Sequence, residues 1–262
     1  MPRRSGGLAG LHELMLGLVR SPAWGLGAVV NFLGFLLQAV ALERGSVSLV
    51  QPIMPTQLLF AVGFAAWSAR SWPGIADWVC SGLVCAGVAL VLVSENGHPT
   101  EPAPERVLFV AGAAAVAIVV LLAVAHRRTP RVAAGATACA AGFCFATTSV
   151  FLKLVADRVA AHGVEGIADP ATIGLVCTTT VGTVLAQAAF AAGPLPWAVA
   201  AMTIVNPVVG YTAGCLAFGG TPPSLPVGLT ASALLVVGVV GLVRSRSAHG
   251  WSPTADHREV VA

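Results

Sequence analysis

The sequence predicts an all-α, polytopic membrane protein with about eight transmembrane helices in two inverted repeats. Three observations carry this prediction. The composition is 56% apolar and only 10% charged, whereas an average globular domain carries about 25% charged residues. Eight apolar stretches each reach or approach the ~20 residues that a helix needs to cross a bilayer. Finally, the sequence contains two similar copies of a hairpin made of two such stretches.

The eight stretches are continuous apolar runs, unlike the alternating segments of about ten residues that build a membrane β-barrel. Helices are expected because each backbone amide in lipid must be satisfied within its own segment. In chain order the predicted spans are Pro22–Leu42, Val47–Trp67, Ile75–Val93, Val107–Ala125, Val132–Val155, Ala171–Ala192, Leu195–Phe218 and Leu225–Val243.

The duplicated hairpin joins the first two spans and the sixth and seventh spans. Its first copy reads GFLLQAVALERGSVSLVQPIMPTQLLF (Gly34–Phe60), and its second reads GTVLAQAAFAAGPLPWAVAAMTIVNPVVG (Gly182–Gly210). Each copy has Gly, Leu and Gln-Ala, then a turn at Gly, then an apolar run broken by Pro. Two related halves are typical of transporters, with the binding site between the halves.

The repeat continues into the third and eighth spans, where SGLVCAGVALVLV (residues 81–93) aligns without a gap with SALLVVGVVGLVR (residues 232–244). The first and sixth spans are five steps apart, an odd number, so the two copies must enter the membrane in opposite directions. The alternative is that Ala-, Val-, Leu- and Gly-rich helices align through composition alone. The fifth span has no counterpart ahead of the first, which predicts that the first helix of the fold is missing.

Loop charges predict the orientation, because Lys and Arg gather in cytoplasmic loops. A cytoplasmic N-terminus places ten of the fourteen basic residues on the cytoplasmic side: Arg3, Arg4, Arg20, Arg70, Arg127, Arg128, Arg131, Arg244, Arg246 and Arg258. We therefore predict a multi-pass protein of the cell membrane with both termini in the cytoplasm.

Five regions follow from this topology. Residues 1–21 form a cytoplasmic N-terminal segment, and residues 22–125 form the first, incomplete repeat. A basic cytoplasmic loop, 126–131, leads to the second repeat, 132–243, and residues 244–262 form a disordered tail. Apolar residues at helical spacing predict an interfacial helix over residues 8–20, and a plain loop is the alternative.

Polar side chains inside the spans are costly unless they pair or face water, so they are functional candidates. The predicted solute-binding residues are Asn31, Gln38, Gln51, Gln57, Thr183, Gln187, Asn206 and Tyr211. Pro52, Pro55 and Pro207 each remove a helical donor, and breaks there predict a polar site at the repeat interface. The alternatives are interhelical hydrogen bonds for Gln38 and Gln187 and packing kinks at the prolines.

Lys153 is the charged residue within a predicted span, and we expect it to extend toward the membrane surface; the alternative is that it faces an anion or substrate. Every Asp and Glu lies at the end of a span or outside the spans, and every His lies outside. The six cysteines are interpreted as small apolar side chains. We predict no enzymatic activity, cofactor, metal site or nucleic-acid partner. The expected partners are the lipid bilayer and a small solute, and a homodimer stays open.

The stretch GFLLQAVALERGSVSLVQPIMPTQLLFAV, starting at Gly34, is similar to a stretch in the drug/metabolite transporter superfamily. More narrowly, it resembles the actinobacterial Ala/Val/Leu-rich membrane proteins near the NIPA-type magnesium transporters and the EamA-type permeases. The resemblance covers about residues 22–93 and 135–243, and its motif is Leu-Gln-Ala-x-Ala-Leu…Gly…Val-Gln-Pro. It implies nine or ten helices in two inverted halves, whereas this chain has eight predicted spans.

The predicted function is transport of a small polar or amphipathic solute by alternating access between the inverted halves. One alternative is a NIPA-like magnesium transporter, although a Mg²⁺ site normally uses one or two carboxylates. The other alternative is a non-transporting or degenerate integral membrane protein, which the missing first helix favours.

Overall fold

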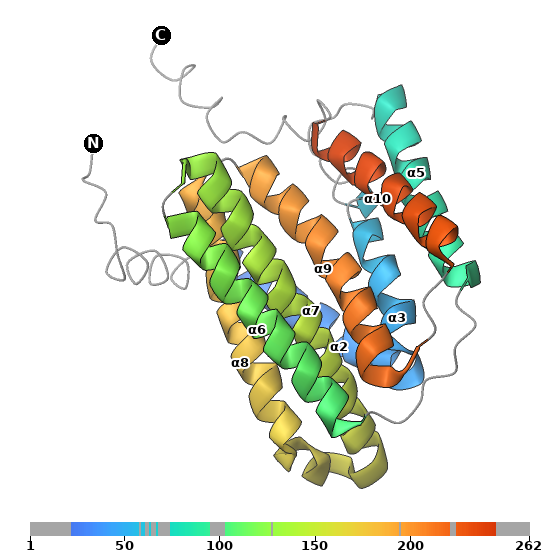
Figure 1. Cartoon of the computed structure of the whole chain (residues 1–262), viewed down its shortest axis with the longest axis vertical. Coiled ribbons are helices and arrows are strands. Elements are labelled where there is room, and N and C mark those ends of the chain that lie inside the picture. Colours follow the sequence, from blue (N-terminus) through green and yellow to red (C-terminus); the bar gives the residue numbers. More distant parts are fainter. Residues whose placement is uncertain are drawn as a thin grey trace.

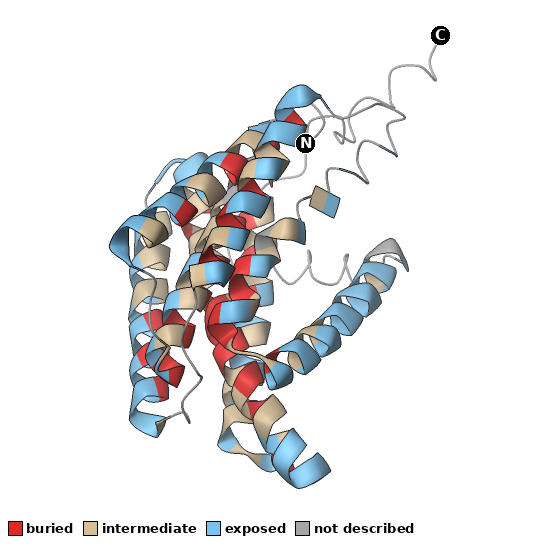
Figure 2. Cartoon of the chain, turned by 90° about the vertical axis from the view of Figure 1, so that its right-hand side faces the viewer, coloured by how far each residue is buried: buried red, intermediate tan, exposed pale blue. Residues whose placement is uncertain are grey.

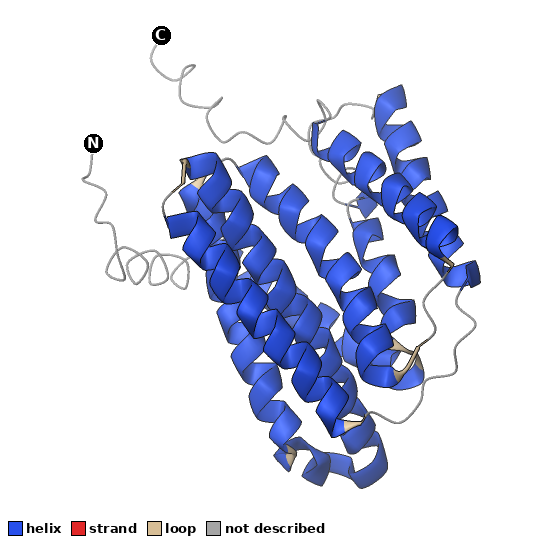
Figure 3. Ribbon diagram, in the orientation of Figure 1, coloured by secondary structure: helices blue, strands red, loops and turns tan. Residues whose placement is uncertain are grey.

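The structure is a computed structural model that describes residues 22–57, 59–60, 63, 67, 74–94, 103–126, 128–193, 195–220 and 224–244. Within these residues the secondary structure is helical, and none of them forms a strand (Figure 3). The interfacial helix predicted over residues 8–20 and the tail predicted after residue 244 lie outside the described residues.

The longest described helix, α7 (Pro130–His162), lies between α6 (Pro104–His126) and α8 (Pro170–Ala192), as Figure 1 shows. The short 3₁₀-helix η2 (Gly163–Ala168) joins α7 to α8. Proline is well suited to the first turn of α7 and α8, because an N–H at that position has no intrahelical acceptor.

Small residues bring the other helices close to α7. A Cβ on Gly142 of α7 would lie 3.0 Å from Val205 Cγ1 of α9 (Leu195–Phe218). A Cβ on Gly182 of α8 would lie 3.0 Å from Cys144 Cβ. Close backbone approach of this kind drives helix association in lipid, where no hydrophobic force acts between helices. Figure 2 shows the buried residues gathered where helices face one another and the outer faces exposed.

Helix α2 (Pro22–Arg44) packs on α7 through its C-terminal half. Leu42 is fully buried and belongs to the same apolar cluster as Val150. One turn earlier, Gln38 Nε2 donates a hydrogen bond to Ser149 Oγ at 3.2 Å. The N-terminal half of α2 is exposed at every residue from 26 to 34, and therefore around its whole circumference.

Helices α5 (Ile75–Ser94) and α10 (Leu225–Arg244) form a second packed pair, which lies on the far side of α9 from the α6–α8 group (Figure 1). A Cβ on Gly238 of α10 would lie 2.7 Å from Val84 Cγ2 and 2.8 Å from the Cys80 carbonyl oxygen. The backbones are therefore in near contact. The buried core of this pair comprises Val84, Val88, Val239 and Leu242.

Six helices of the described chain are long and apolar enough to cross a membrane, and a further one, Ile75–Val91, is apolar but shorter. The prediction of a helical, multi-pass membrane protein is thereby confirmed. The fifth span is longer than predicted, since α7 continues past Val155 to His162. It ends at Gly163, whose φ of +65° is a left-handed conformation that glycine adopts at little cost.

Predicted counterparts of the two repeats lie against each other. The third and eighth spans form the α5–α10 pair, and the second span packs on the seventh, α9. Both contacts run antiparallel: Val47 meets Gly214 while Gln51 meets Gly210 in one, and Gly87 meets Leu235 while Cys80 meets Gly241 in the other. Opposite directions are what an inverted repeat requires. The repeat itself and the cytoplasmic placement of both termini stay predictions.

Candidate functional site

The second predicted span is not a single regular helix. It begins as one helical turn, α3 (Val47–Val50), and continues as the 3₁₀-helix η1 (Gln51–Thr56). The change of helix type coincides with Pro52 and Pro55, which lie inside η1. Neither proline can donate an α-helical hydrogen bond, so a regular α-helix cannot be maintained through them. The backbone is therefore irregular at the place where the sequence predicts a solute site.

Gln51, the first residue of η1, is fully buried, with 0% of its surface exposed. Neither its amide nitrogen nor its amide oxygen has a hydrogen-bond partner among the described residues. An unpartnered buried polar group costs about 1–3 kcal/mol, so few of them occur in folded proteins. This cost makes Gln51 the leading candidate for a binding residue.

The amide of Gln51 lies against a notch in α9. A Cβ on Gly210 would be 2.5 Å from Gln51 Cδ and 2.6 Å from its Oε1. One turn further, a Cβ on Gly214 would be 2.9 Å from Val47 Cβ and 3.0 Å from the Ser48 backbone nitrogen. The two glycines thus allow α9 to approach α3 and η1 closely.

Asn206 lies one turn before Gly210 and therefore on the same face of α9. Its amide oxygen is buried and finds no hydrogen-bond partner within the described part of the chain. The next residue, Pro207, lies inside α9 and cannot donate to the carbonyl of Thr203. The contact between α3, η1 and α9 is called the η1 site below. It contains two prolines from η1, one proline from α9, and one unpartnered amide from each of these two helices.

The other predicted binding residues are distributed over three helices. Asn31 on α2, Gln57 after η1 and Thr183 on α8 are exposed, whereas Gln187 on α8 and Tyr211 on α9 are half-buried. Gln38 pairs with Ser149, as the interhelical hydrogen-bond alternative predicts. The structure thus places Gln51 against α9 at Gly210 and Asn206 one turn away on α9, near Gly142 of α7, and the binding roles of all these residues stay predictions.

A hydroxyl cluster on α7 was not predicted. Thr147, Thr148 and Ser149 are all buried, and each donates to a carbonyl one turn earlier in the helix. Thr148 Oγ1 also lies 3.0 Å from Thr178 Oγ1 of α8, while Ser149 accepts the bond from Gln38 of α2. Three consecutive hydroxyl residues inside an apolar span are the sequence signal for this cluster, which joins α2, α7 and α8.

Lys153 reaches toward the C-terminal end of α7, where its ammonium group is held by two described partners. Its side chain is 10% exposed, and Nζ donates to Asp157 Oδ1 at 2.7 Å and to the Glu43 carbonyl at 3.4 Å. The sequence interpretation ended the fifth span at Val155. Because α7 continues, Asp157 lies one turn beyond Lys153 and supplies its counterion. The ammonium group also ties the C-terminal end of α2 to α7.

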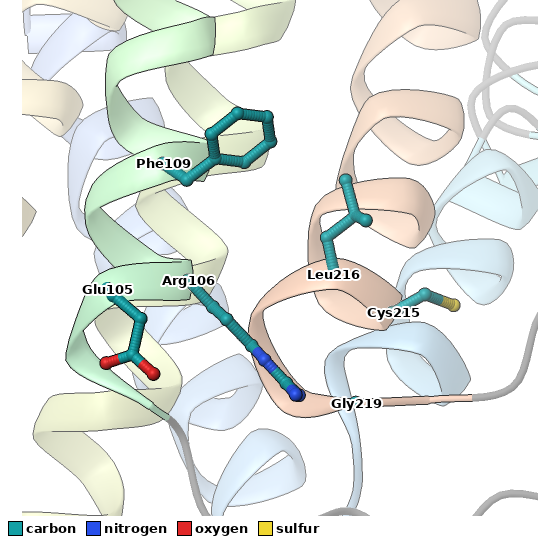
Figure 4. A pocket seen from close by; sticks show the side chains of 6 residues that line it. All are labelled: Glu105, Arg106, Phe109, Cys215, Leu216 and Gly219. Atoms are coloured by element: carbon teal, nitrogen blue, oxygen red, sulfur yellow. The ribbon is translucent and has the colours of Figure 1, made fainter.

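An open pocket of about 460 Å³ lies between the start of α6 and the end of α9. Figure 4 shows Arg106 extending toward Gly219, while the carboxylate of Glu105 points away from α9. Phe109 and Leu216 form apolar walls. This pocket is at the helix ends, and none of the predicted site residues lines it.

Taken together, the helices define a polytopic helical membrane protein with an unpartnered amide at a broken helix. Residues 15–93, which include α2, η1 and α5, match the model of the EamA-like transporter family. An uncharacterized protein of Corynebacterium glutamicum is 28% identical over 211 residues, which cover 78% of this chain and 72% of the relative. No solved structure matches the chain. The match is to the EamA-type part of the predicted resemblance, and the narrower likeness to NIPA-type magnesium transporters stays a prediction.

Proposed function

We propose that the protein is a membrane transporter that carries a small solute past the η1 site by alternating access. The observation that carries this proposal is Gln51, a fully buried amide without a described partner, at a proline-broken helix. Broken helices within the membrane are characteristic of transporter binding sites, because irregular backbone is tolerated there only around a cavity or buried in protein. The match of residues 15–93 to a transporter family supports the same function.

The geometry suggests which contact must open. In the predicted orientation, α3 begins and α9 ends at the outer membrane surface. The Val47–Gly214 contact then closes the outer end of the η1 site, and Gln51 against Gly210 closes the next level inward. Contacts made on a glycine face involve little interdigitation, so the two helices can separate without repacking large side chains. Outward opening would consist of α9 moving away from α3.

A reversible cross-link tests this mechanism. The Cβ of Val47 and the Cβ position of Gly214 are 2.9 Å apart, which is shorter than the ~3.5–4.5 Å of disulfide-bonded residues, so the two helices must part slightly to accept the bond. The double variant Val47→Cys/Gly214→Cys is made in a chain whose six native cysteines are replaced by Ala. Proteoliposomes are incubated with an isotope-labelled bacterial metabolite extract, and the accumulated solutes are identified by mass spectrometry. We expect accumulation to stop on oxidation and to return on reduction.

The single variants Val47→Cys and Gly214→Cys are the controls, since oxidation should leave their activity unchanged. Equal accumulation by the oxidised and reduced double variant would contradict outward opening at this contact. If neither the variant nor the unmodified protein accumulates any solute above protein-free liposomes, the non-transporting alternative is correct. Mg²⁺ entry into the same liposomes, followed with an entrapped magnesium indicator, would instead establish the magnesium alternative.

A further inference from the structure

We propose that the η1 site selects a solute carrying a neutral, planar group that both donates and accepts hydrogen bonds, such as a carboxamide. In this proposal Gln51 is the residue that recognises the group. This inference rests on the proposed function, because the solute reaches Gln51 only when α9 moves away. It goes further in stating the chemistry of the solute and the residue that determines specificity.

The first step is the chemistry of Gln51 itself. Its Nε2 can donate and its Oε1 can accept, and both atoms are buried without partners among the described residues. A solute that satisfied one atom alone would leave the other unpaired in the membrane interior. A buried unpaired polar group weakens binding strongly, so the favoured solute is one that satisfies both. A second amide presents this pattern, with its carbonyl accepting from Nε2 and its N–H donating to Oε1.

The second step is charge. The polar side chains of the η1 site include the amides of Gln51 and Asn206 and the hydroxyls of Ser48 and Thr56, and none of these groups carries a net charge. Lys153, a buried cation in the described part of the chain, is hydrogen-bonded to Asp157 and to a backbone carbonyl of α2, and so belongs to the α2–α7 contact. Transfer of an ion into an environment of neutral amides within the membrane is far more costly than transfer of a neutral group. A neutral head group is therefore favoured over an ammonium or a carboxylate.

The third step is shape. The amide of Gln51 occupies the space where a side chain at residue 210 would lie. When α9 withdraws, that notch and the face that carries Asn206 become available to the solute. The amide oxygen of Asn206, one turn away on α9 and also without a described partner, is a further neutral acceptor for a solute N–H once α9 has moved. Gln51 and Asn206 together thus complement a primary amide more fully than an ester or an alcohol.

Three probes with the same body and different heads test the inference. Benzamide donates and accepts, benzoate only accepts, and benzamidinium only donates; acetamide, acetate and acetamidinium repeat the series without a ring. Binding is measured on the purified full-length protein as a rise in its melting temperature with probe concentration. For the unmodified protein we expect stabilisation by the neutral amides, with at least about 10-fold weaker effects from both charged heads, the ratio that one hydrogen bond supplies.

Gln51→Glu provides the decisive variant. Its carboxylate has nearly the shape of the amide but only accepts hydrogen bonds, so it complements an amidinium. We expect the preference to switch, with the amide effect falling and the amidinium effect rising by about 10-fold or more. Gln51→Met, which neither donates nor accepts there, should lose discrimination among the three heads. Ser224→Glu adds the same charge at an exposed position outside the predicted binding residues and is the matched control, in which the preference should not change.

The results separate this inference from the proposed function. Stabilisation by amides without any accumulation in liposomes would overturn transport and leave the amide site in place. Accumulation of a solute without stabilisation by either neutral amide would overturn the amide site and leave transport in place. A Gln51→Glu protein that keeps the preference of the unmodified protein would also overturn the role of Gln51. If that variant does not fold, the Gln51→Met comparison decides.

Discussion

Replacing Gln51 by methionine should stabilise the protein and abolish transport. Methionine keeps the unbranched shape of glutamine and removes both unpartnered amide atoms. Relief of one unsatisfied buried amide is worth about 1–3 kcal/mol, and an imperfect fit against Gly210 returns up to about 1.5 kcal/mol. We therefore expect the free energy of unfolding to rise by about 1 kcal/mol.

The matched control is Gln38→Met, which removes the other amide of the first hairpin that is not exposed. Gln38 donates to Ser149 at 3.2 Å, and an interhelical hydrogen bond of this kind contributes about 0.6–1.7 kcal/mol. The two substitutions should therefore move the melting temperature in opposite directions. At about 2–4 °C per kcal/mol for a chain of this length, the variants should differ by roughly 4–8 °C. The intrinsic fluorescence of the six tryptophans, recorded on heating in one detergent, measures this difference.

The combination of effects distinguishes a binding residue from a structural one. A residue that contributes to binding at the expense of stability gives a more stable and inactive protein when it is replaced. If Gln51→Met lowers the melting temperature as Gln38→Met does, the Gln51 amide contributes to the fold and the reasoning fails. Full uptake by a stabilised Gln51→Met protein would equally refute a role in transport.

Other predictions concern the remaining contacts. Gly214→Ala should lower the free energy of unfolding by about 1–3 kcal/mol, because the new Cβ would overlap α3. Gly112→Ala, at a residue with open space around it, should leave stability unchanged. Equal melting temperatures of the two variants would contradict close α3–α9 packing. Asp157→Asn should cost about 1–3 kcal/mol because it leaves the Lys153 ammonium, 10% exposed, without its anion. Lys153→Met should cost less, since Asp157 is 39% exposed and water can solvate it, and the reverse order of denaturation midpoints would refute this. Val164→Cys, at a residue 80% exposed, should react with an impermeant maleimide in intact spheroplasts; a requirement for permeabilisation would reverse the predicted orientation.

The helical spans could be predicted from the sequence because few backbone conformations are stable in lipid. An apolar run of about 20 residues must be helical, and the runs that became α6 and α8 show no competing pattern. Prolines were equally informative, since Pro52 and Pro55 remove donors whatever their surroundings. The place where the second span changes to η1 is therefore a property of the local sequence.

The side chains that contact one another between helices could not be predicted in this way. The alignment paired Gln38 with Gln187, yet the side chain of Gln38 bonds to Ser149, a residue 111 positions away in a span outside the repeat alignment. Lys153 acquired its counterion because α7 extends about two turns further than apolarity alone indicates. The Gly210 notch is filled by Gln51, and a glycine in so glycine-rich a sequence gives no sign of which side chain it faces.

The distribution of polar contacts suggests which parts of the protein move together. The hydrogen bonds between spans that involve α7, Gln38–Ser149 and Thr148–Thr178, join α2, α7 and α8 into one body. The contacts that α9 and α10 make with the first half use glycines instead, at Gly210, Gly214 and Gly238. A hydrogen bond in lipid resists separation because its broken groups find no water, whereas a glycine face only loses van der Waals contact. Relative motion should therefore occur along the glycine faces, and one of them covers Gln51.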